Sequence, residues 1–397
     1  MEQARIFAAA GVALALSFAL TPLAIRLAPR VGAVDVPRDG RRMHASPVPR
    51  LGGLAIFFAV LIPSAMLGMA QGTLSRWLTG ATLLVLLGIL DDVFRLPALV
   101  KLIVQILASV IAVSGGGVEQ LTLWRMSVSL GLWRAPLSVV WLLACINAHN
   151  MIDGLDGLSA SVSAVEALSL SVIFFVQGNT PLSGASLLVC GACLGYLPYN
   201  RHPARVFMGD TGSQFLGFAL GLLSMSIDQS AAGSLGALVP LLVLAIPLSD
   251  LGFAVVRRLL RGQSPFAADR GHWHHRLIDA GLSQRQVCFW MVLLSALLGS
   301  AAVLISRQEW YGYAVYALLW GIIVLMSRFK YDSMTPARSW LRCFVMPLPP
   351  LRSAGPDGYR LPVRGRYIRA SSAADTVVSD LHAARACGMR RPALFRS

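Results

Sequence analysis

The stretch "LLVLLGILDDVFRL", residues 83–96, joins an apolar run to two adjacent carboxylates, Asp91 and Asp92. The run is long enough to form part of a membrane-spanning helix. Ionisable side chains at the edge of hydrocarbon are costly and are commonly functional. The end of a helix also disfavours acidic residues, because its free carbonyl groups carry partial negative charge. The stretch therefore predicts a membrane helix that ends at a cation or a basic partner.

The composition of the whole chain is that of a polytopic membrane protein. Of its 397 residues, 56% are hydrophobic and only 13% are charged. A soluble protein of this length cannot bury so much apolar surface in one core. We expect an all-α fold with about eleven transmembrane helices. The expected spans are residues 6–28, 51–70, 74–90, 97–114, 135–149, 157–177, 181–198, 212–229, 235–257, 286–305 and 310–327.

The basic residues predict the orientation of these spans. If the N-terminus is outside, few basic residues fall on or beside external segments, and the rest lie on the other side. Basic loops stay in the cytoplasm, so the C-terminus is also expected there. The net charge of +15 then reflects topology and anionic lipids, and nucleic-acid binding is not expected. The external basic residues are Arg5, Arg76, Arg125, Arg134 and Arg307.

The chain divides into two parts by composition. Residues 1–327 hold the apolar spans and are expected to form a transmembrane catalytic domain. Residues 328–397 are rich in Arg, Pro and Ser and have no sustained apolar period. Such a composition predicts a basic, disordered cytoplasmic tail.

Five polar segments fall on the predicted cytoplasmic side, and their convergence would form a site at the membrane surface. Asp91 and Asp92 point about 100° apart on a helix, which predicts different partners for the two. The segments are "DVPRDGRRMHASPVPRLGG" (35–53), the Asp91–Asp92 pair with Lys101, "NAHNMIDGLDGLSA" (147–160), "PYNRHPARVFMGDTGS" (198–213) and "RRLLRGQSPFAADRGHWHHRL" (257–277).

Each of these segments also has a structural explanation. Asp153 and Asp156 would share one helix face, yet Asp156 also suits the N-cap of the following helix. Asp210 precedes a helix whose N-terminus would favour a phosphate and its metal. The spacing of the "HWHH" histidines does not match a zinc site, and the flanking arginines favour an anion. Two explanations fit the arginines of 35–53 equally well: contact with a phosphate, or a basic loop that stays in the cytoplasm.

Over residues 1–327 the five segments resemble those of the polyprenyl-phosphate N-acetylhexosamine-1-phosphate transferases, a glycosyltransferase family 4 group. The resemblance implies transfer of the sugar-1-phosphate of a UDP-N-acetylhexosamine to undecaprenyl phosphate, with release of UMP. It implies Mg²⁺ as cofactor, with Mn²⁺ as an alternative. It also implies a bacterial inner-membrane protein, surrounded by membrane lipids, whose active site faces the cytoplasm. Homodimerisation is left open.

The resemblance also implies roles for individual residues. Asp210 resembles the principal Mg²⁺ ligand, with Asp153 beside it. Asp91 resembles the residue that activates the lipid phosphate, Asp92 its partner, and Lys101 a phosphate contact. The implied catalytic histidines are His272, His274 and His275. The implied substrate-binding residues are Arg38, His44, Asn147, Asn150, Asp153, Asp156, Asn200, Phe207 and Arg270.

The histidine segment indicates the branch within this family. "DRGHWHHRL" is similar to the undecaprenyl-phosphate N-acetylglucosamine-1-phosphate transferase branch, and it lacks the histidine run followed by Phe-Glu of the muramoyl-pentapeptide branch. Trp273 and His149 depart from the usual pattern, where smaller or apolar residues are common.

A membrane transporter of a cation or nucleotide sugar is the alternative function. Transporters place charges near the midplane and often contain internal repeats. We find no repeat, and Glu166 and Asp250 are expected nearer the edges of their spans. A catalytically dead scaffold would be expected to lose Asp91, Asp92 or Asp210, which are all present.

Overall fold

The computed structural model describes residues 2–36, 46–68, 72–114, 116–123, 126–232, 236–264 and 271–308, with a few positions between 314 and 321. These residues belong to one compact unit, residues 1–333. The helices are α1 (Glu2–Val31), α2 (Gly52–Met66), α3 (Thr73–Phe94), α4 (Ala98–Val113), η1 (Gly131–Trp133), α5 (Arg134–Ile152), α6 (Leu158–Val176), α7 (Thr180–Asn200), α8 (Gly209–Met225), α9 (Leu238–Val243), α10 (Ala245–Leu260), α11 (Trp273–Asp279) and α12 (Gln284–Ser306). The strands are β1 (Val34–Asp35), β2 (Val48–Pro49), β3 (Gln120–Leu123) and β4 (Met126–Ser129).

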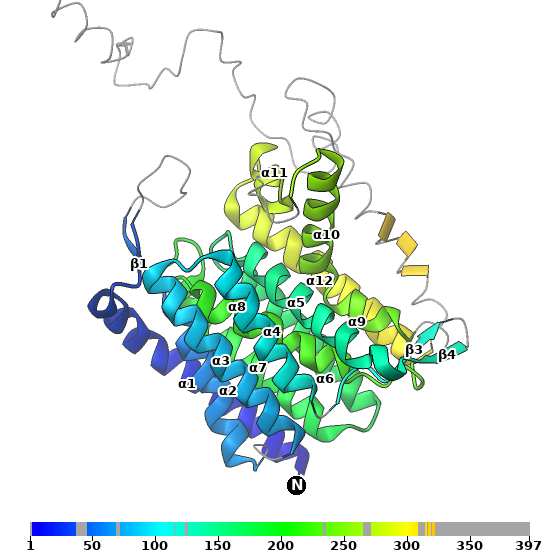
Figure 1. Ribbon diagram of the computed structural model, residues 1–397. Coiled ribbons are helices and arrows are strands. Elements are labelled where there is room, and N and C mark those ends of the chain that lie inside the picture. The colour runs from blue at the N-terminus through cyan, green and yellow to red at the C-terminus, as the bar shows by residue number, and fades with distance from the viewer. Residues whose placement is uncertain are drawn as a thin grey trace, which may run out of the picture. The chain divides into compact units, whose positions relative to one another are not determined.

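The helices pack side by side around α8. Both α3 and α5 contact α8, and α4 fills the space next to α3 and α5 (Figure 1). On the other side, α1 packs on α7 and α2, and α6 packs on α7 and α12. Helix α8 is buried along almost its whole length, although its sequence contains Asp210 and Gln214. Polar residues on α8 must therefore find partners on the helices around it.

Six helices of the described residues are long and apolar enough to cross a membrane, so the protein is a multi-pass membrane protein by composition. These are Ile6–Val31, Leu74–Phe94, Gly131–Ile152, Leu158–Val176, Thr180–Asn200 and Gln284–Ser306. Helices α2 and α4 are apolar but shorter. The predicted count of eleven spans and the predicted orientation are not confirmed.

One expected span differs from the structure, and another lies mostly outside the described residues. The segment 235–257 was expected as one helix, but it is divided at Leu244 into the short α9 and the longer α10. Leu244 has φ −97° and ψ 21°, outside regular helix geometry, and Pro240 and Pro247 flank the break. Most of the expected span 310–327, and the tail 328–397, lie outside the described residues.

The all-α expectation needs a small correction, because the fold contains two antiparallel hairpins. Strands β1 and β2 pair Val34 with Pro49, and β3 and β4 pair Gln120 with Ser129. The first hairpin matters for the site, because the Arg50 amide continues it by donating to the Ala33 carbonyl at 2.9 Å.

The turn between α3 and α4 explains why an apolar helix ends at an acidic pair. Arg95 adopts a left-handed conformation with φ 55°, and its amide donates to the Asp91 carbonyl. Pro97 then begins α4 as its N-cap, where a fixed φ is tolerated. The chain reverses within three residues, so that α4 returns alongside α3.

Glycines allow α2 and α3 to approach the first turn of α8 closely. A Cβ atom on Gly53 would overlap the backbone of Gly212, and one on Gly88 would overlap the backbone of Thr211. Gly209 starts α8 with φ +68°, a conformation that glycine adopts without strain. The start of α8 is therefore held against the end of α3 at backbone contact distance.

Candidate functional site

Asp91 and Asp92 at the end of α3 have different partners, as their angular separation predicted. Asp91 Oδ1 accepts a hydrogen bond from the Leu96 amide at 2.8 Å, which closes the turn. Asp92 accepts from the amides of Asp210 and Thr211 at 3.1 and 3.2 Å and from the Thr211 hydroxyl at 2.8 Å. Asp92 therefore caps the N-terminus of α8, where free amides carry partial positive charge.

Two basic side chains pair with the carboxylates of Asp91, Asp92 and Asp210. Lys101 Nζ lies 3.2 Å from Asp91 Oδ2 and 3.0 Å from Asp210 Oδ2. One guanidinium nitrogen of Arg50 lies 3.4 Å from Asp92 Oδ1 and 3.8 Å from Asp210 Oδ1. We call these five residues the carboxylate cluster. The Lys101 and Arg50 side chains remain 25% and 26% exposed, so a ligand can reach the positive charges.

Arg50 belongs to the cluster, although the sequence did not distinguish it from the other arginines of segment 35–53. Its position is fixed by the backbone around it. The Phe207 amide donates to the Pro49 carbonyl at 2.8 Å, and the Phe207 carbonyl accepts from the Gly52 amide at 3.0 Å. The half-buried Phe207 therefore lies at the cluster. The predicted residues Arg38, His44 and Arg270 lie outside the described residues.

A chain of amides connects Asp210 to Asn147. Gln214 Nε2 donates to Asp210 Oδ2 at 3.1 Å, and Gln105 Nε2 donates to Gln214 Oε1 at 3.1 Å. Asn147 Nδ2 donates to Gln105 Oε1 at 3.1 Å and to the Leu143 carbonyl at 2.8 Å. Gln105 and Gln214 were not predicted as site residues. Their signal in the sequence is an amide side chain inside an apolar helix, which requires a partner.

Asn150 lies one turn after Asn147 on the same face of α5. Its Nδ2 donates to Ser213 Oγ at 3.0 Å, and Ser213 donates in turn to the Gly209 carbonyl. The side chain therefore binds the first turn of α8 beside Asp210. Asn147 and Asn150 both link α5 to the carboxylate cluster.

Asp153 caps the C-terminus of α5 and lies in the same electrostatic environment. Burial raises the pKa of Asp153 well above its ordinary value. Arg50 opposes this shift, whereas the carboxylates of Asp210, Asp92 and Asp156 add to it. An additional cation near these acids would favour the charged form of Asp153.

Asp156 and Asn200 have protein partners that join two loops. Asp156 Oδ2 lies 2.7 Å from His202 Nδ1. Asn200 accepts from the Gly157 amide at 3.1 Å and donates to the Val206 carbonyl at 2.9 Å. These bonds hold the loop before α8 against the loop before α6. The predicted role of both residues in substrate binding remains a prediction.

The histidine segment is anchored by Asp250 of α10. His272 Nδ1 lies 3.0 Å from Asp250 Oδ2, and the Trp273 amide donates to Asp250 Oδ1 at 2.9 Å. The Asp250 carboxylate therefore binds the first residue of α11 and holds the ring of His272 in place. The ring of His274 lies against Gly154, so closely that a Cβ atom on residue 154 would overlap the ring. The histidine segment therefore contacts the loop that follows α5.

His274 is buried, and its Nδ1 has no hydrogen-bond partner in the protein. Burial lowers the pKa of His274 to about 3; His275 and His272 add to the shift, and Asp250 opposes it. The rings of His274 and His275 are 4.3 Å apart between centroids. His274 is therefore neutral at physiological pH, with one ring nitrogen available.

Both departures from the family pattern are buried and have partners. Trp273 stacks on Phe253 with ring centroids 5.9 Å apart. His149 Nε2 lies 2.8 Å from Glu166 Oε2, its Nδ1 lies 2.9 Å from the Cys145 carbonyl, and neither His149 nor Glu166 has an exposed side chain. Glu166 lies at the centre of α6, so the expectation that it lies near the edge of its span is wrong.

The predicted convergence of the five polar segments is confirmed for their described residues. Arg50 joins the first segment to the second and fourth through Asp92 and Asp210. The bond from Gly157 to Asn200 joins the third segment to the fourth. The contact between His274 and Gly154 joins the fifth segment to the third.

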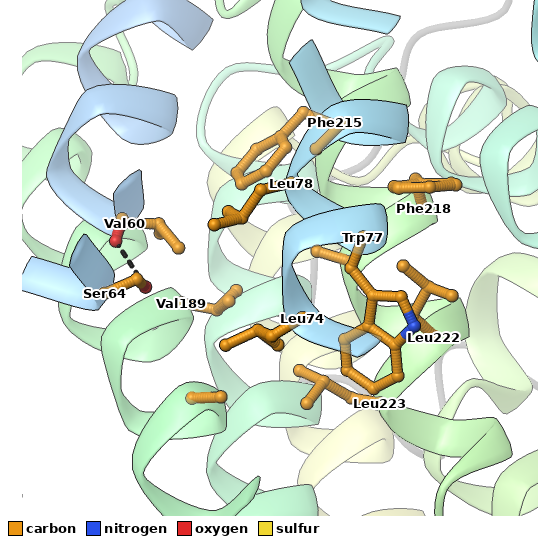
Figure 2. A pocket seen from close by; sticks show the side chains of 13 residues that line it. Val60, Ser64, Leu74, Trp77, Leu78, Val189, Phe215, Phe218, Leu222 and Leu223 are labelled. Carbon is orange, nitrogen blue, oxygen red and sulfur yellow. Dashed lines mark hydrogen bonds between the residues drawn. The ribbon is translucent and has the colours of Figure 1, made fainter. Parts of the chain in front are cut away.

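An apolar pocket lies away from this site, between α2, α3, α7 and α8 (Figure 2). Its lining includes Trp77, Leu78, Phe215 and Phe218, and the hydroxyl of Ser64 is bonded to the Val60 carbonyl of its own helix. On α3 the nearest lining residue precedes Asp91 by ten positions, or about 15 Å of helix, and on α8 Phe215 follows Asp210 by five positions, or about 7.5 Å. The pocket offers no charged group and does not suit a phosphate or a metal.

The carboxylate cluster suits a cation that is shared with a substrate. Among the described residues, no set of three His, Cys, Asp or Glu side chains is arranged to hold a metal ion. Mg²⁺ does not require such a set, since it commonly takes one or two carboxylates together with waters and substrate phosphates. The ammonium group of Lys101 already lies between Asp91 and Asp210. The donor set therefore fits Mg²⁺ held jointly by the protein and a phosphate.

Comparison with known proteins identifies similar chains. The model of glycosyl transferase family 4 matches residues 74–228. A probable undecaprenyl-phosphate N-acetylglucosaminyl 1-phosphate transferase of Bacillus subtilis is 37% identical over 79% of this chain and 89% of its own length. The decaprenyl-phosphate N-acetylglucosaminephosphotransferase of Mycolicibacterium smegmatis is 32% identical over 85% of this chain and 86% of its own length. The undecaprenyl-phosphate alpha-N-acetylglucosaminyl 1-phosphate transferase of Escherichia coli K12 is 30% identical over 76% of this chain and 82% of its own length.

Proposed function

The chain belongs to glycosyl transferase family 4, in its prenyl-phosphate N-acetylglucosamine-1-phosphate transferase branch, and we propose that it transfers N-acetylglucosamine-1-phosphate from UDP-N-acetylglucosamine to undecaprenyl phosphate. The products are the undecaprenyl-diphosphate sugar and UMP. In the reaction, an oxygen of the lipid phosphate bonds to the phosphorus that carries the sugar. The bond from that phosphorus to the bridging oxygen breaks, and UMP leaves.

The observation that carries this proposal is the position of Lys101 between Asp91 and Asp210. Two anionic substrates repel each other, so a transfer site needs positive charge at the phosphates. Lys101 and Arg50 supply that charge, and both keep an exposed portion. When phosphates bind, the two basic groups exchange part of their contact with the carboxylates for contact with phosphate oxygens.

We assign the acceptor side of the site to Asp91. It lies at the end of an apolar helix, where the phosphate of a membrane lipid arrives. Its Oδ1 is held by the Leu96 amide, which leaves Oδ2 next to Lys101. A carboxylate in that position can take a proton from the lipid phosphate and orient it. Asp92 acts indirectly, since it holds the first turn of α8 in place.

We assign the donor side to Asp210 and the residues of the third segment. Asp210 would hold Mg²⁺ together with the diphosphate of the nucleotide sugar, and Asp153 would be its neighbouring ligand. When bound, the ion neutralises charge on the diphosphate and on the departing UMP. Asn150 keeps the first turn of α8 oriented. His274 lies against this loop and His275 lies beside it, so the two rings can contact the sugar or its phosphate.

We propose that this site faces the cytoplasm of a bacterial inner membrane. The polar ends of α3, α5, α7 and α8 meet at one end of the bundle, where the described basic residues Arg50 and Lys101 lie. The sequence places most other basic residues in connecting segments of the same predicted side. Basic loops remain in the cytoplasm. A nucleotide sugar would enter from that side, while the lipid acceptor would enter from the membrane.

The test is a transfer assay with purified protein, undecaprenyl phosphate and Mg²⁺. A panel of UDP-sugars is offered, and UMP release is measured. We expect turnover with UDP-N-acetylglucosamine and none with UDP-muramoyl-pentapeptide. Efficient use of the pentapeptide donor would refute the assignment of the branch. Uptake of labelled nucleotide sugar into vesicles without UMP release would favour the transporter alternative.

A further inference from the structure

The amide chain from Asp210 to Asn147 has no role in the mechanism given above. Gln214 and Gln105 are 1% and 4% exposed, and each donates to the next acceptor toward Asp210. Buried amides cost free energy unless both their donor and acceptor atoms have partners. Gln105 lies one turn after Lys101 on α4, so the chain runs directly beneath the carboxylate cluster.

The direction of the chain is fixed by its two ends. An ionised Asp210 carboxylate only accepts hydrogen bonds, so Gln214 must present its Nε2 and direct its Oε1 toward Gln105. Gln105 must then present its own Nε2 and offer Oε1 to Asn147. The Leu143 carbonyl at the far end also only accepts, and it faces Asn147 Nδ2 at 2.8 Å. One orientation of all three amides satisfies both ends.

This orientation determines what Asn147 offers to a ligand. Its Nδ2 is occupied by Gln105 and Leu143. Its Oδ1 accepts no hydrogen bond from the described residues, and the side chain is half-buried. Asn147 therefore presents a carbonyl oxygen, which attracts an N–H or O–H group and repels a phosphate oxygen.

We propose that Gln105 and Gln214 are positioning residues, which hold Asn147 with its Oδ1 directed as an acceptor toward a hydroxyl or amide N–H of the nucleotide sugar. The inference rests on the proposed function. It assigns Asn147 to the uncharged part of the donor and leaves the phosphates to Lys101 and Arg50. Without the chain, only the bond to the Leu143 carbonyl holds the amide of Asn147 in this orientation.

The test is a double-mutant cycle of Gln105→Met and Gln214→Met. Methionine is unbranched and similar in size to glutamine, so packing is retained. Each single variant leaves one buried amide without its partner and should lower the midpoint of thermal unfolding. The double variant removes both amides, so its midpoint should return toward wild type. Gln120→Met on the exposed β3–β4 hairpin is the matched control.

Activity separates positioning from packing. Loss of one oriented hydrogen bond corresponds to about a tenfold change. We expect the KM for UDP-N-acetylglucosamine to rise about tenfold in both singles and in the double variant, with the KM for undecaprenyl phosphate unchanged. A double variant that recovers stability and wild-type KM together would contradict the proposal and assign the glutamines a packing role only.

The result also distinguishes this inference from the proposed function. A wild-type protein that releases no UMP from any UDP-sugar refutes the function. In that case the unfolding midpoints still test the chain, because two independent glutamines would give additive losses. Additive midpoints would contradict the coupled chain whatever the activity.

Discussion

The carboxylate cluster and the His149–Glu166 pair both place acidic groups beside basic ones within an apolar helix bundle. They differ in exposure. Lys101 and Arg50 are 25% and 26% exposed, whereas neither side chain of the pair has any exposed surface. The cluster can exchange its internal ion pairs for contacts with a ligand. The pair is closed to solvent, and its one hydrogen bond joins His149 Nε2 to Glu166 Oε2.

The two regions also differ in what they connect. The cluster joins α3, α4 and α8 with the loop before α2 through residues far apart in the sequence. The pair joins only α5 to α6. We infer that the cluster serves chemistry and the pair serves packing, although both consist of ionisable groups within an apolar bundle. Changes in the cluster should therefore affect activity more than stability, and changes in the pair should do the reverse.

The largest effect is expected for Asp210→Asn. The substitution keeps the shape but removes the charge that holds a hard cation, so we expect UMP release to fall about 1,000-fold. The midpoint of thermal unfolding should change little, because the amide can still accept a hydrogen bond. Asp228→Asn, on an exposed loop after α8, is the control and should remain near wild type. If Asp210→Asn keeps nearly the activity of the wild type, the carboxylate cluster has no part in the reaction.

A smaller loss of activity is expected for Lys101→Met. The variant retains the aliphatic stem but removes the charge between Asp91 and Asp210. We expect kcat to fall about 100-fold, because charge on the reacting phosphates is no longer stabilised. Steady-state kinetics, with each substrate varied in turn, measure the change in kcat. An unchanged kcat with lower stability would make Lys101 a structural residue, like the members of the pair.

The pair should respond in the opposite way. Glu166→Leu leaves His149 Nε2 buried without its partner, and an unpaired buried polar group costs about 1–3 kcal/mol of stability. Replacing both residues with leucine should restore most of the loss. Unfolding in detergent measures stability, and UMP release per folded molecule should change only a few-fold. A large loss of activity in the stable double variant would show that the pair belongs to the site.

The smallest effect is expected from removing residues 331–397. None of the predicted site residues lies there. The basic, Pro-rich composition predicts a segment without a packed core, so transfer activity should stay within about twofold of wild type. An inactive but folded truncated protein would give the tail a catalytic role.

Some parts of the site were predictable because their signals are local. Two aspartates at the end of an apolar run predicted a basic partner, and Lys101 is that partner. Their angular separation predicted different contacts, which the structure confirms. The helices were predictable from apolar run length. The break at Leu244 was missed, because apolar run length does not register Pro240 and Pro247, which flank the break.

Other parts depend on contacts between residues that are distant in sequence. Gln105 and Gln214 are separated by more than a hundred positions, and only the fold makes them neighbours. Arg50 could not be distinguished from the arginines around it until the β1–β2 hairpin fixed its position. Glu166 was expected near the edge of its span, although the expected bounds 157–177 already place it near the middle. Its partner there, His149 of the preceding helix, could not be read from the sequence.

A titration of Mg²⁺ with Asp91→Asn and Asp210→Asn tests the central claim, that one end of the carboxylate cluster acts on the donor and the other on the acceptor. UMP release is measured for both variants over the same Mg²⁺ range. The account predicts that high Mg²⁺ restores part of the activity of Asp210→Asn, since a weakened metal site is refilled by mass action. It predicts no recovery for Asp91→Asn, since a proton acceptor is lost. Recovery of Asp91→Asn but not of Asp210→Asn would contradict the assignment.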